Sequence, residues 1–335
     1  MERVGIGLVG CGLFGESHLQ AYRGVPNAAV RAIFDTDRER AERLAAAFQV
    51  PRVCESLDEL CGLPEIDLVD VVTPEADHAR PVLTAFAKGK HVFVEKPLAT
   101  DLAECSRMIE AARASGRFLM VGHILRFETK YAMLKEELAS GRLGEIVSLH
   151  ARRNRLKELL PRYGRIHPVL ETGIHDIDLM LWYVGKPVRR VRGFARSITG
   201  GVHPDTFWGV LEFETGAVGV IETIWLLPKA AGISLDDAFR VVGATGLGNL
   251  QLVPAALSFW REDGYEVPDV SYDPRVRNSA RGALRDELSY LCDCVTEGRA
   301  PELNTGVDGR RALRVAQALI ESAAAGADVE IQGWD

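Results

Sequence analysis

The stretch GLVGCGLFG, residues 7–15, decides the fold of the first part of this 335-residue chain. Gly10, Gly12 and Gly15 form the pattern G-x-G-x-x-G, which follows a short apolar run and opens an amphipathic segment. Asp35 lies 20 residues after Gly15, at the end of the next apolar run. Glycines let the backbone approach a pyrophosphate, a helix N-terminus attracts its charge, and an acid at this spacing binds ribose hydroxyls. The context favours a dinucleotide site over the plainer alternative, a tight turn without a ligand.

Short apolar runs alternate with amphipathic segments through the first third of the chain. The predicted strands are 3–9, 29–35, 67–73, 91–95 and 117–122, and the predicted helices include 37–48 and 101–116. Alternation at this spacing is typical of a parallel sheet with helices on both faces.

The pattern changes after about residue 122. Helices are predicted at 127–140, 168–184, 281–297 and 308–325, and strands at 145–153, 188–198, 205–213, 217–227, 239–246 and 248–253. The strand-rich part predicts a large, mostly antiparallel open sheet. The fold class is therefore α/β, with a Rossmann dinucleotide-binding domain over 1–122. An α+β domain for substrate binding and oligomerisation follows over 123–335.

The bulk composition excludes several classes of protein. The formal net charge of −7 gives no general attraction for nucleic acid or for an anionic membrane. No apolar stretch approaches the roughly 20 residues of a membrane span, and no signal peptide is evident. The six cysteines show no zinc or disulfide spacing. We therefore expect a cytoplasmic enzyme with reduced cysteines and no nucleic-acid or membrane partner.

The run VFVEKPLAT, residues 92–100, ends a buried strand with Glu95, Lys96 and Pro97. Ligands of doubly wound sheets bind outside the carboxyl ends of the strands, and this motif lies at such an end. Lys96 could bond a substrate hydroxyl and stabilise an alkoxide as hydride leaves its carbon. Pro97 restricts the backbone there. A surface ion pair is the alternative, and the position of the motif weakens it.

The segment IHPVLETGIHDIDLMLWY, residues 166–183, predicts a helix with two stripes. One stripe is apolar (Leu170, Ile174, Ile177 and Leu181), and a second, about 100° round the helix, carries Glu171, His175, Asp178 and Trp182. A histidine beside a core-facing stripe can act as a general base near neutral pH. A solvated polar face would explain the two acids but explains His175 less well.

A metal site is a weaker interpretation of the same helix. His167, Glu171 and His175 follow one another at intervals of four residues. Pro168 places His167 at the helix cap, and three ligands on one helix form an incomplete site. We therefore predict no metal.

Two further features concern the dinucleotide. Thr73 and Pro74 end a predicted strand at its ligand-facing edge, and Thr73 is a plausible cofactor contact. Asp35 would repel a 2′-phosphate, which favours NAD over NADP. Arg38 and Arg40 lie close enough in sequence to leave NADP possible.

These motifs resemble those of the glucose–fructose oxidoreductase, inositol dehydrogenase and rhizopine-catabolism family, Gfo/Idh/MocA. The resemblance extends over essentially the whole chain. Its motifs are the glycine pattern, TPEADHA (73–79), GKHVFVEKPLA (89–99), VGHILRF (121–127) and ETGIHDID (171–178). Of these, GKHVFVEKPLA is the most specific. The resemblance implies a Rossmann domain followed by a domain with an open sheet that often mediates oligomers.

The resemblance also implies roles for individual residues. The implied cofactor contacts are Gly10, Gly12, Leu13, Phe14, Gly15, Asp35, Thr73, Pro74, His78, Glu95 and Lys96. The implied catalytic residues are Lys96, His175 and Glu171, and the implied substrate contacts are Lys96, Arg126, Asn154, Glu171 and His175. Glu171 stands where the family often has aspartate, and Glu75 where it usually has asparagine. The Lys96–Pro97 bond is implied to be cis.

The basic run at residues 152–155 is open to two interpretations. Its arginines could border the substrate cleft beside Asn154, or they could form a solvated strand edge. Trp225, at the end of a predicted strand, could form a wall of the pocket, although core packing is the commoner use of such a residue.

The resulting prediction is an NAD-dependent dehydrogenase that oxidises a secondary hydroxyl of a sugar, a sugar derivative or a cyclitol. His175 would take the hydroxyl proton, while Lys96 stabilises the oxyanion and relays the proton. Alternatives are a dinucleotide-binding regulator, an NAD-recycling glycoside-cleaving enzyme, and a reductase of unsaturated or aromatic substrates. The open sheet predicts a homodimer or homotetramer.

Overall fold

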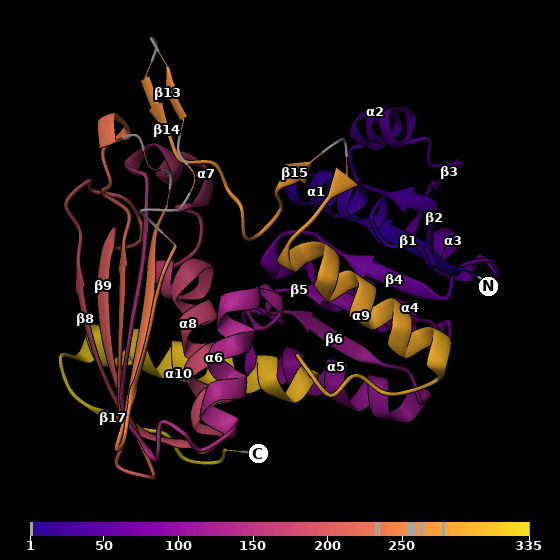
Figure 1. Cartoon of the computed structure of the whole chain (residues 1–335). Helices are drawn as coiled ribbons and strands as arrows, with labels where there is room; N and C mark the ends of the chain where they lie inside the picture. The colour runs from indigo at the N-terminus through magenta and orange to yellow at the C-terminus, as the bar shows by residue number, and fades with distance from the viewer. Residues whose placement is uncertain are drawn as a thin grey trace. The chain divides into compact units, whose positions relative to one another are not determined.

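The computed structural model describes residues 3–231, 233, 235–252, 257, 259–261, 264–276 and 279–334. Contacts divide the chain into two compact units (Figure 1). Unit 1 comprises Met1–Thr129 and Asp269–Arg310, and unit 2 comprises Lys130–Pro268 and Arg311–Asp335. Val253, the last residue of the strand predicted at 248–253, lies outside the described residues.

Unit 1 contains a six-stranded parallel sheet with the order β3-β2-β1-β4-β5-β6. The strands are β1 (Val4–Val9), β2 (Ala28–Phe34), β3 (Arg52–Val53), β4 (Leu68–Val71), β5 (His91–Glu95) and β6 (Leu119–Gly122). This order is that of the doubly wound dinucleotide-binding fold, which confirms the predicted Rossmann sheet. The edge strand β3 was not predicted, because two residues are too few to show a period.

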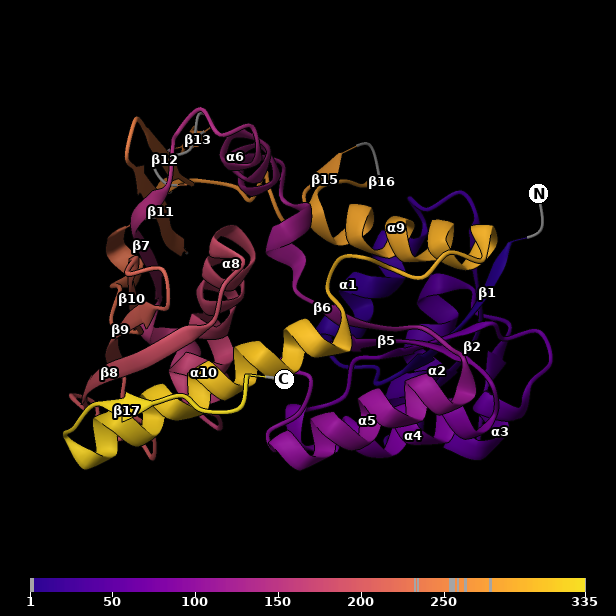
Figure 2. The ribbon, with the colours of Figure 1, turned by 90° about the horizontal axis from the view of Figure 1, so that it is seen from below.

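Helices cover both faces of this sheet. They are α1 (Leu13–Tyr22), α2 (Arg38–Phe48), α3 (Leu57–Gly62), α4 (Ala79–Ala87), α5 (Leu102–Ser115) and α9 (Ala283–Glu297), with 3₁₀ turns η1 (Glu75–Asp77) and η2 (Ile124–Phe127). A short pair of strands, β15 (Arg275–Val276) and β16 (Ser279–Ala280), precedes α9. Helices α1 and α9 lie on one face, and α4 and α5 on the other (Figure 2). Local signals explain the helix boundaries: the Asp37 carboxylate caps α2 by accepting the Arg40 N–H, and Gly116 ends α5 in the left-handed conformation.

Helix α9 belongs to the core of unit 1. Leu284, Leu288 and Leu291 recur along one face of the helix and are buried in a cluster that includes Ile6 of β1 and Phe93 of β5. Contacts thus group α9 with unit 1, whereas a division of the chain at residue 122 places it in the second domain. The apolar stripe predicted the helix but carried no information about which sheet it would cover.

Unit 2 contains a seven-stranded sheet with the order β12-β11-β7-β10-β9-β8-β17. Its strands are β7 (Ile146–Arg155), β8 (Val188–Arg196), β9 (Thr206–Phe213), β10 (Val218–Ile224), β11 (Leu235–Gly243), β12 (Leu247–Gln251) and β17 (Val329–Glu330). Strands β7 and β10 pair in parallel, and the other neighbours pair antiparallel. The predicted mostly antiparallel sheet is confirmed. A small hairpin, β13 (Phe259–Arg261) and β14 (Gly264–Glu266), lies outside it.

The helices of unit 2 are α6 (Thr129–Ala139), α7 (Leu160–Tyr163), α8 (Ile174–Val184) and most of α10 (Gly306–Ala325), with short turns η3 (Lys157–Leu159) and η5 (Lys229–Ala231). Glycines in the strands let α8 and α10 approach the sheet closely. A Cβ at Gly193 would lie 2.3 Å from the Leu319 carbonyl oxygen of α10, and one at Gly219 would lie 2.7 Å from the Met180 sulfur of α8. Both glycines therefore mark the helix-covered face of this sheet.

The chain enters α8 through a π-helical turn, η4 (Val169–Gly173). A π turn contains one more residue than an α turn, so it shifts the sequence register of the buried face. The predicted apolar stripe is correct from Ile174 onward. It is wrong one turn earlier, where Val169 is fully buried and Leu170 is partly exposed.

A buried ion-pair network joins β7 to α8 and β11. The guanidinium of Arg153, 1% exposed, donates two hydrogen bonds to Asp176, at 2.8 and 3.0 Å. It also donates to Asp237 at 2.7 Å and to the Tyr131 hydroxyl at 3.2 Å, and Arg155 approaches Asp237 from the other side. Burial raises the pKa of Asp176, and the charge of Arg153 opposes that effect. Arg153 therefore does not belong to a solvated strand edge.

Replacing Arg153 with methionine should destabilise unit 2 by about 3–5 kcal/mol, because Asp176 and Asp237 lose a buried countercharge. The matched control is Arg152→Met on the neighbouring residue, whose partly exposed pair with Asp236 should be worth about 0–1 kcal/mol. Urea unfolding of the two variants measures the difference. Equal midpoints would show that the network contributes no stability beyond that of a surface pair.

Candidate active site

The glycine turn leaves an open surface at the start of α1. Gly10 has φ +103°, and a Cβ there would lie 2.6 Å from the Val72 carbonyl oxygen; a Cβ at Gly15 would lie 2.2 Å from the Gly10 carbonyl oxygen. A Cβ at Gly12, in contrast, would meet nothing within 4 Å. Gly10 and Gly15 are thus required by the fold, while Gly12 leaves room for a ligand.

The N-terminus of α1 can receive an anion at this surface. No side chain caps it, and the adjoining residues Leu13 and Phe14 are 58% and 45% exposed. The first N–H groups of a helix have no acceptors within the helix and carry partial positive charge. The turn therefore fits the pyrophosphate of a dinucleotide.

Asp35 is fixed beside the glycine turn. Its carboxylate accepts the Cys11 N–H at 2.7 Å and the Asp37 N–H at 2.8 Å, and its side chain is 8% exposed. Arg40 lies 3.7 Å from Asp35 but also pairs with Asp37. Arg38 donates hydrogen bonds to the carboxylates of Glu42 and Glu55. Both arginines are thus already beside carboxylates, which favours a ribose without a 2′-phosphate.

His78 joins two turns at the ligand-facing edge of the sheet. One ring nitrogen lies 2.9 Å from the Pro97 carbonyl oxygen, and the other lies 3.0 Å from the Thr73 carbonyl oxygen. Burial lowers the pKa of His78, and these carbonyl oxygens oppose that effect. Thr73 is partly exposed and Pro74 is exposed, so they are accessible to a cofactor, whereas His78 is 1% exposed. A direct cofactor contact of His78 stays a prediction.

Lys96 follows directly after β5 and is partly exposed. Its backbone N–H donates to the Glu95 carboxylate at 3.1 Å, and the Lys96–Pro97 peptide bond is cis, as the resemblance implied. Arg126, in η2, is 5% exposed and lies 3.5 Å from the Asp308 carboxylate. Unit 1 thus places Lys96, Thr73 and the glycine turn at the same edge of the sheet, since each follows the carboxyl end of a strand.

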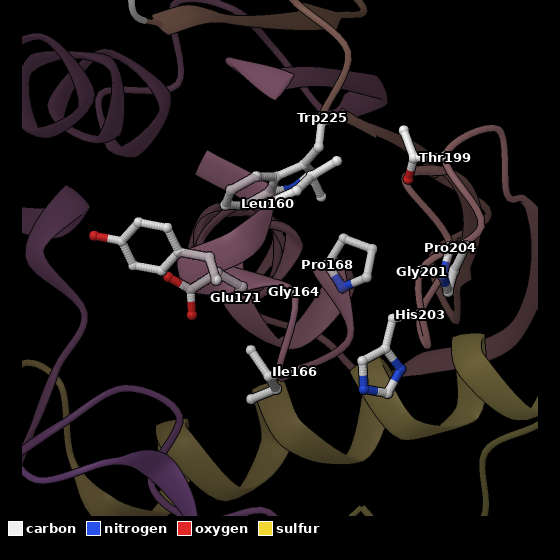
Figure 3. Close-up of a pocket in the computed structure, with 11 residues that line it drawn as sticks. Leu160, Gly164, Ile166, Pro168, Glu171, Thr199, Gly201, His203, Pro204 and Trp225 are labelled. Atoms are coloured by element: carbon white, nitrogen blue, oxygen red, sulfur yellow. The ribbon is translucent and has the colours of Figure 1, made fainter. Parts of the chain in front are cut away.

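In unit 2, Glu171 borders a small pocket of about 100 Å³ (Figure 3). The lining residues are Leu160, Tyr163, Gly164, Ile166, Pro168, Glu171, Thr199, Gly201, His203, Pro204 and Trp225. The carboxylate of Glu171 and the imidazole of His203 lie at different ends of the pocket. His175, one turn beyond Glu171, is partly exposed and is not among the lining residues. Trp225, 4% exposed, lines this pocket, and its place in the wall of a substrate pocket stays a prediction.

Asn154 lies apart from these side chains. Its amide nitrogen donates to Glu222 at 2.9 Å, and its amide oxygen accepts the Ile224 N–H at 2.9 Å. Successive residues of a strand point to opposite faces, and the preceding Arg153 reaches α8. Asn154 therefore points to the other face of the sheet, and its role as a substrate contact stays a prediction.

Sequence reasoning missed a buried charged cluster in unit 1. His18 of α1 lies 2.8 Å from Asp70 of β4 and 3.4 Å from Glu95, and all three side chains are less than 10% exposed. The available signal was Asp70, a charge within the apolar run of a predicted central strand. Among the described residues, no group of three or more His, Cys, Asp and Glu side chains could hold a metal ion, and no helix is long and apolar enough to cross a membrane.

Comparisons with known proteins extend over both units. Residues 4–123 match the model of an oxidoreductase family with an NAD-binding Rossmann fold, and residues 131–249 match the GFO/IDH/MocA C-terminal domain. The chain is 33% identical to inositol 2-dehydrogenase 2 of Saccharopolyspora erythraea, over 98% of this chain and 95% of that protein. It is 38% identical to inositol 2-dehydrogenase of Acidothermus cellulolyticus, over 95% and 92%.

A solved structure agrees with these matches. The crystal structure of GenD2 from gentamicin A biosynthesis, in complex with NAD, superposes with a TM-score of 0.87. Its sequence identity is 25%, and the match covers 99% of this chain and 97% of that one.

Proposed function

The chain belongs to the GFO/IDH/MocA oxidoreductase family and binds NAD through its Rossmann fold, and on that premise we propose that it oxidises a secondary hydroxyl of an inositol. The observation that carries the proposal is the match to inositol 2-dehydrogenases over 98% and 95% of the chain. Glu171 in place of the usual aspartate leaves other cyclitols and sugars as the nearest alternatives.

The proposed chemistry assigns one step to each of two residues. His175, from α8, takes the proton of the substrate hydroxyl as a general base. Lys96, at the end of β5, donates a hydrogen bond to the oxygen and stabilises the negative charge that develops on it. Bound NAD would supply a nicotinamide ring as the acceptor for the hydride that leaves the carbinol carbon. Gly12 and the start of α1 would hold its pyrophosphate, and Asp35 would accept hydrogen bonds from its ribose.

The test is the appearance of NADH, with NAD and a panel of inositol isomers, free sugars, sugar acids and nucleotide sugars. We expect turnover on an inositol at a rate above that on any sugar of the panel. Turnover on a sugar alone would contradict an inositol as the substrate but would still support a dehydrogenase activity. NAD binding without any NADH would favour a regulator or an enzyme that recycles the hydride on its substrate.

A preference for NAD over NADP follows from Asp35. The variant Asp35→Asn should lower kcat/KM for NAD by roughly 10- to 100-fold, since a charge-assisted bond to the ribose is lost. The ratio of NADP to NAD use should rise in the same variant. The matched control is Asp37→Asn, which removes the same charge two residues away and keeps a helix-capping side chain. An unchanged cofactor ratio in Asp35→Asn would refute the role given to Asp35.

We further propose that the enzyme is cytoplasmic and forms a homodimer or homotetramer through the sheet of unit 2. The face of that sheet opposite α8 and α10 carries Phe194, Trp208 and Val218, which are 51%, 36% and 37% exposed. Apolar side chains gathered on one face are typical of a surface between copies of a chain. A solution mass equal to that of a monomer would refute this part of the proposal.

A further inference from the structure

A chain of three buried side chains leads from the cofactor-binding helix to Lys96. His18 on α1 and Asp70 on β4 are 0% exposed, and Glu95 at the end of β5 is 7% exposed. Asp70 lies 2.8 Å from one ring nitrogen of His18, and Glu95 lies 3.4 Å from the other. The second oxygen of Glu95 accepts the N–H of Lys96 at 3.1 Å. Each member thus restricts the orientation of the next.

The two carboxyl groups of this cluster favour the protonated form of His18. Burial acts to lower the pKa of His18, but the charge and hydrogen bond of Asp70, with the contact of Glu95, outweigh it and raise the pKa to about 10. His18 is therefore a cation between two carboxylates. Glu287 also faces the cluster, and burial, with the charge of Glu95, raises its pKa well above the usual range. An ionised Glu95 without His18 would be a buried carboxylate lacking its nearest cation.

The cluster adjoins the cofactor turn as well. The ring of Phe14, in the exposed first turn of α1, lies 5.3 Å from the ring of His18. On the other side, Gly122 of β6 leaves space for Glu95, because a Cβ there would lie 2.6 Å from a carboxylate oxygen. Glu95 is therefore held by a cation on one side and given space by a glycine on the other.

We propose that His18 is a positioning residue of the reaction, which holds the Glu95 carboxylate so that Glu95 fixes the backbone from which Lys96 extends. The proposal rests on the function proposed above, in which Lys96 contacts the substrate oxygen. Asp70 fixes the orientation of the His18 ring. The reaction then depends on a residue of α1 that touches neither substrate nor reacting atoms.

The first test needs no substrate. Hydrogen exchange of the Lys96 amide, measured at residue resolution in the full chain, reports its bond to Glu95. His18→Gln should speed that exchange at least tenfold, while the amides of Val92 and Val94 in the same strand change less than twofold. The control is His91→Gln, at the other end of β5, which should leave the exchange of Lys96 as it is.

A second variant disturbs Glu95 without changing any charge. Gly122→Ala keeps a backbone conformation that alanine adopts, and its Cβ would displace the Glu95 carboxylate, 2.6 Å away, and press on the Phe93 ring, 3.1 Å away. It should speed exchange of the Lys96 amide as His18→Gln does. This variant keeps the inference testable if His18→Gln does not fold.

Kinetics on the substrate that the panel identifies give the second readout. Both variants should lower kcat at least tenfold and change KM for NAD less than threefold, since a displaced Lys96 affects the reacting oxygen more than cofactor binding. Lys96 exchange within twofold of wild type in both variants would overturn the proposal. Faster Lys96 exchange with no inositol turnover in the wild type would support the positioning and refute the proposed function, so the two failures are distinguishable.

Discussion

The variant Lys96→Met should lose about 10²- to 10⁴-fold in kcat for NADH formation and keep its affinity for NAD. Methionine fills a similar volume but cannot donate a hydrogen bond to the oxygen on which charge develops. Lys96, after β5, is one of several implied cofactor contacts, whereas the turn proposed to receive the pyrophosphate lies after β1, so NAD affinity should depend little on Lys96 alone. Initial rates and titration of NAD by fluorescence measure the two quantities.

The matched control for this variant is Lys88→Met. Lys88 follows α4, is 45% exposed at its side chain and lies 3.9 Å from Asp58, so its replacement should leave kcat unchanged. Full activity of Lys96→Met would show that Lys96 has no role in the reaction and serves only the structure at the end of β5.

The variant His175→Asn should lower kcat at least 100-fold, because asparagine cannot accept the hydroxyl proton. Its residual activity should rise with pH, as hydroxide takes over removal of the proton. His150→Asn is the control, since His150 is exposed on β7 of the same unit. A pH profile of His175→Asn parallel to that of the wild type, at an undiminished rate, would contradict the role of His175 as a general base.

The elements whose signals are local could be predicted from the sequence. The glycine pattern and Asp35 determine β1, α1 and β2 within one βαβ unit, and each is found as predicted. The helix around His175 was also found, but its first turn is π-helical and shifts Val169 into the core in place of Leu170. An inserted residue of this kind leaves the periodicity of the following turns intact, so the pattern alone does not reveal it.

Long-range contacts could not be predicted in the same way. The motif that indicates Lys96 is contiguous in sequence, whereas the cluster behind it joins residues 18, 70 and 95 from three elements. Arg153 belongs to a basic run that fits either a cleft border or a solvated strand edge, and its acid partners at 176 and 237 become its neighbours only in the folded sheet. The pairing of charges that are distant in sequence depends on the order of the strands. The sequence indicates the type of sheet but not that order.

Hydride transfer from a carbinol carbon to NAD can be followed with an inositol that carries deuterium on that carbon. Hydride leaves carbon without exchanging with water, so we expect deuterium in the nicotinamide ring of the reduced cofactor. Lys96→Met should form this labelled product far more slowly. Reduced cofactor that contains only protium from the solvent, or oxidised inositol without any reduced cofactor, would contradict the account.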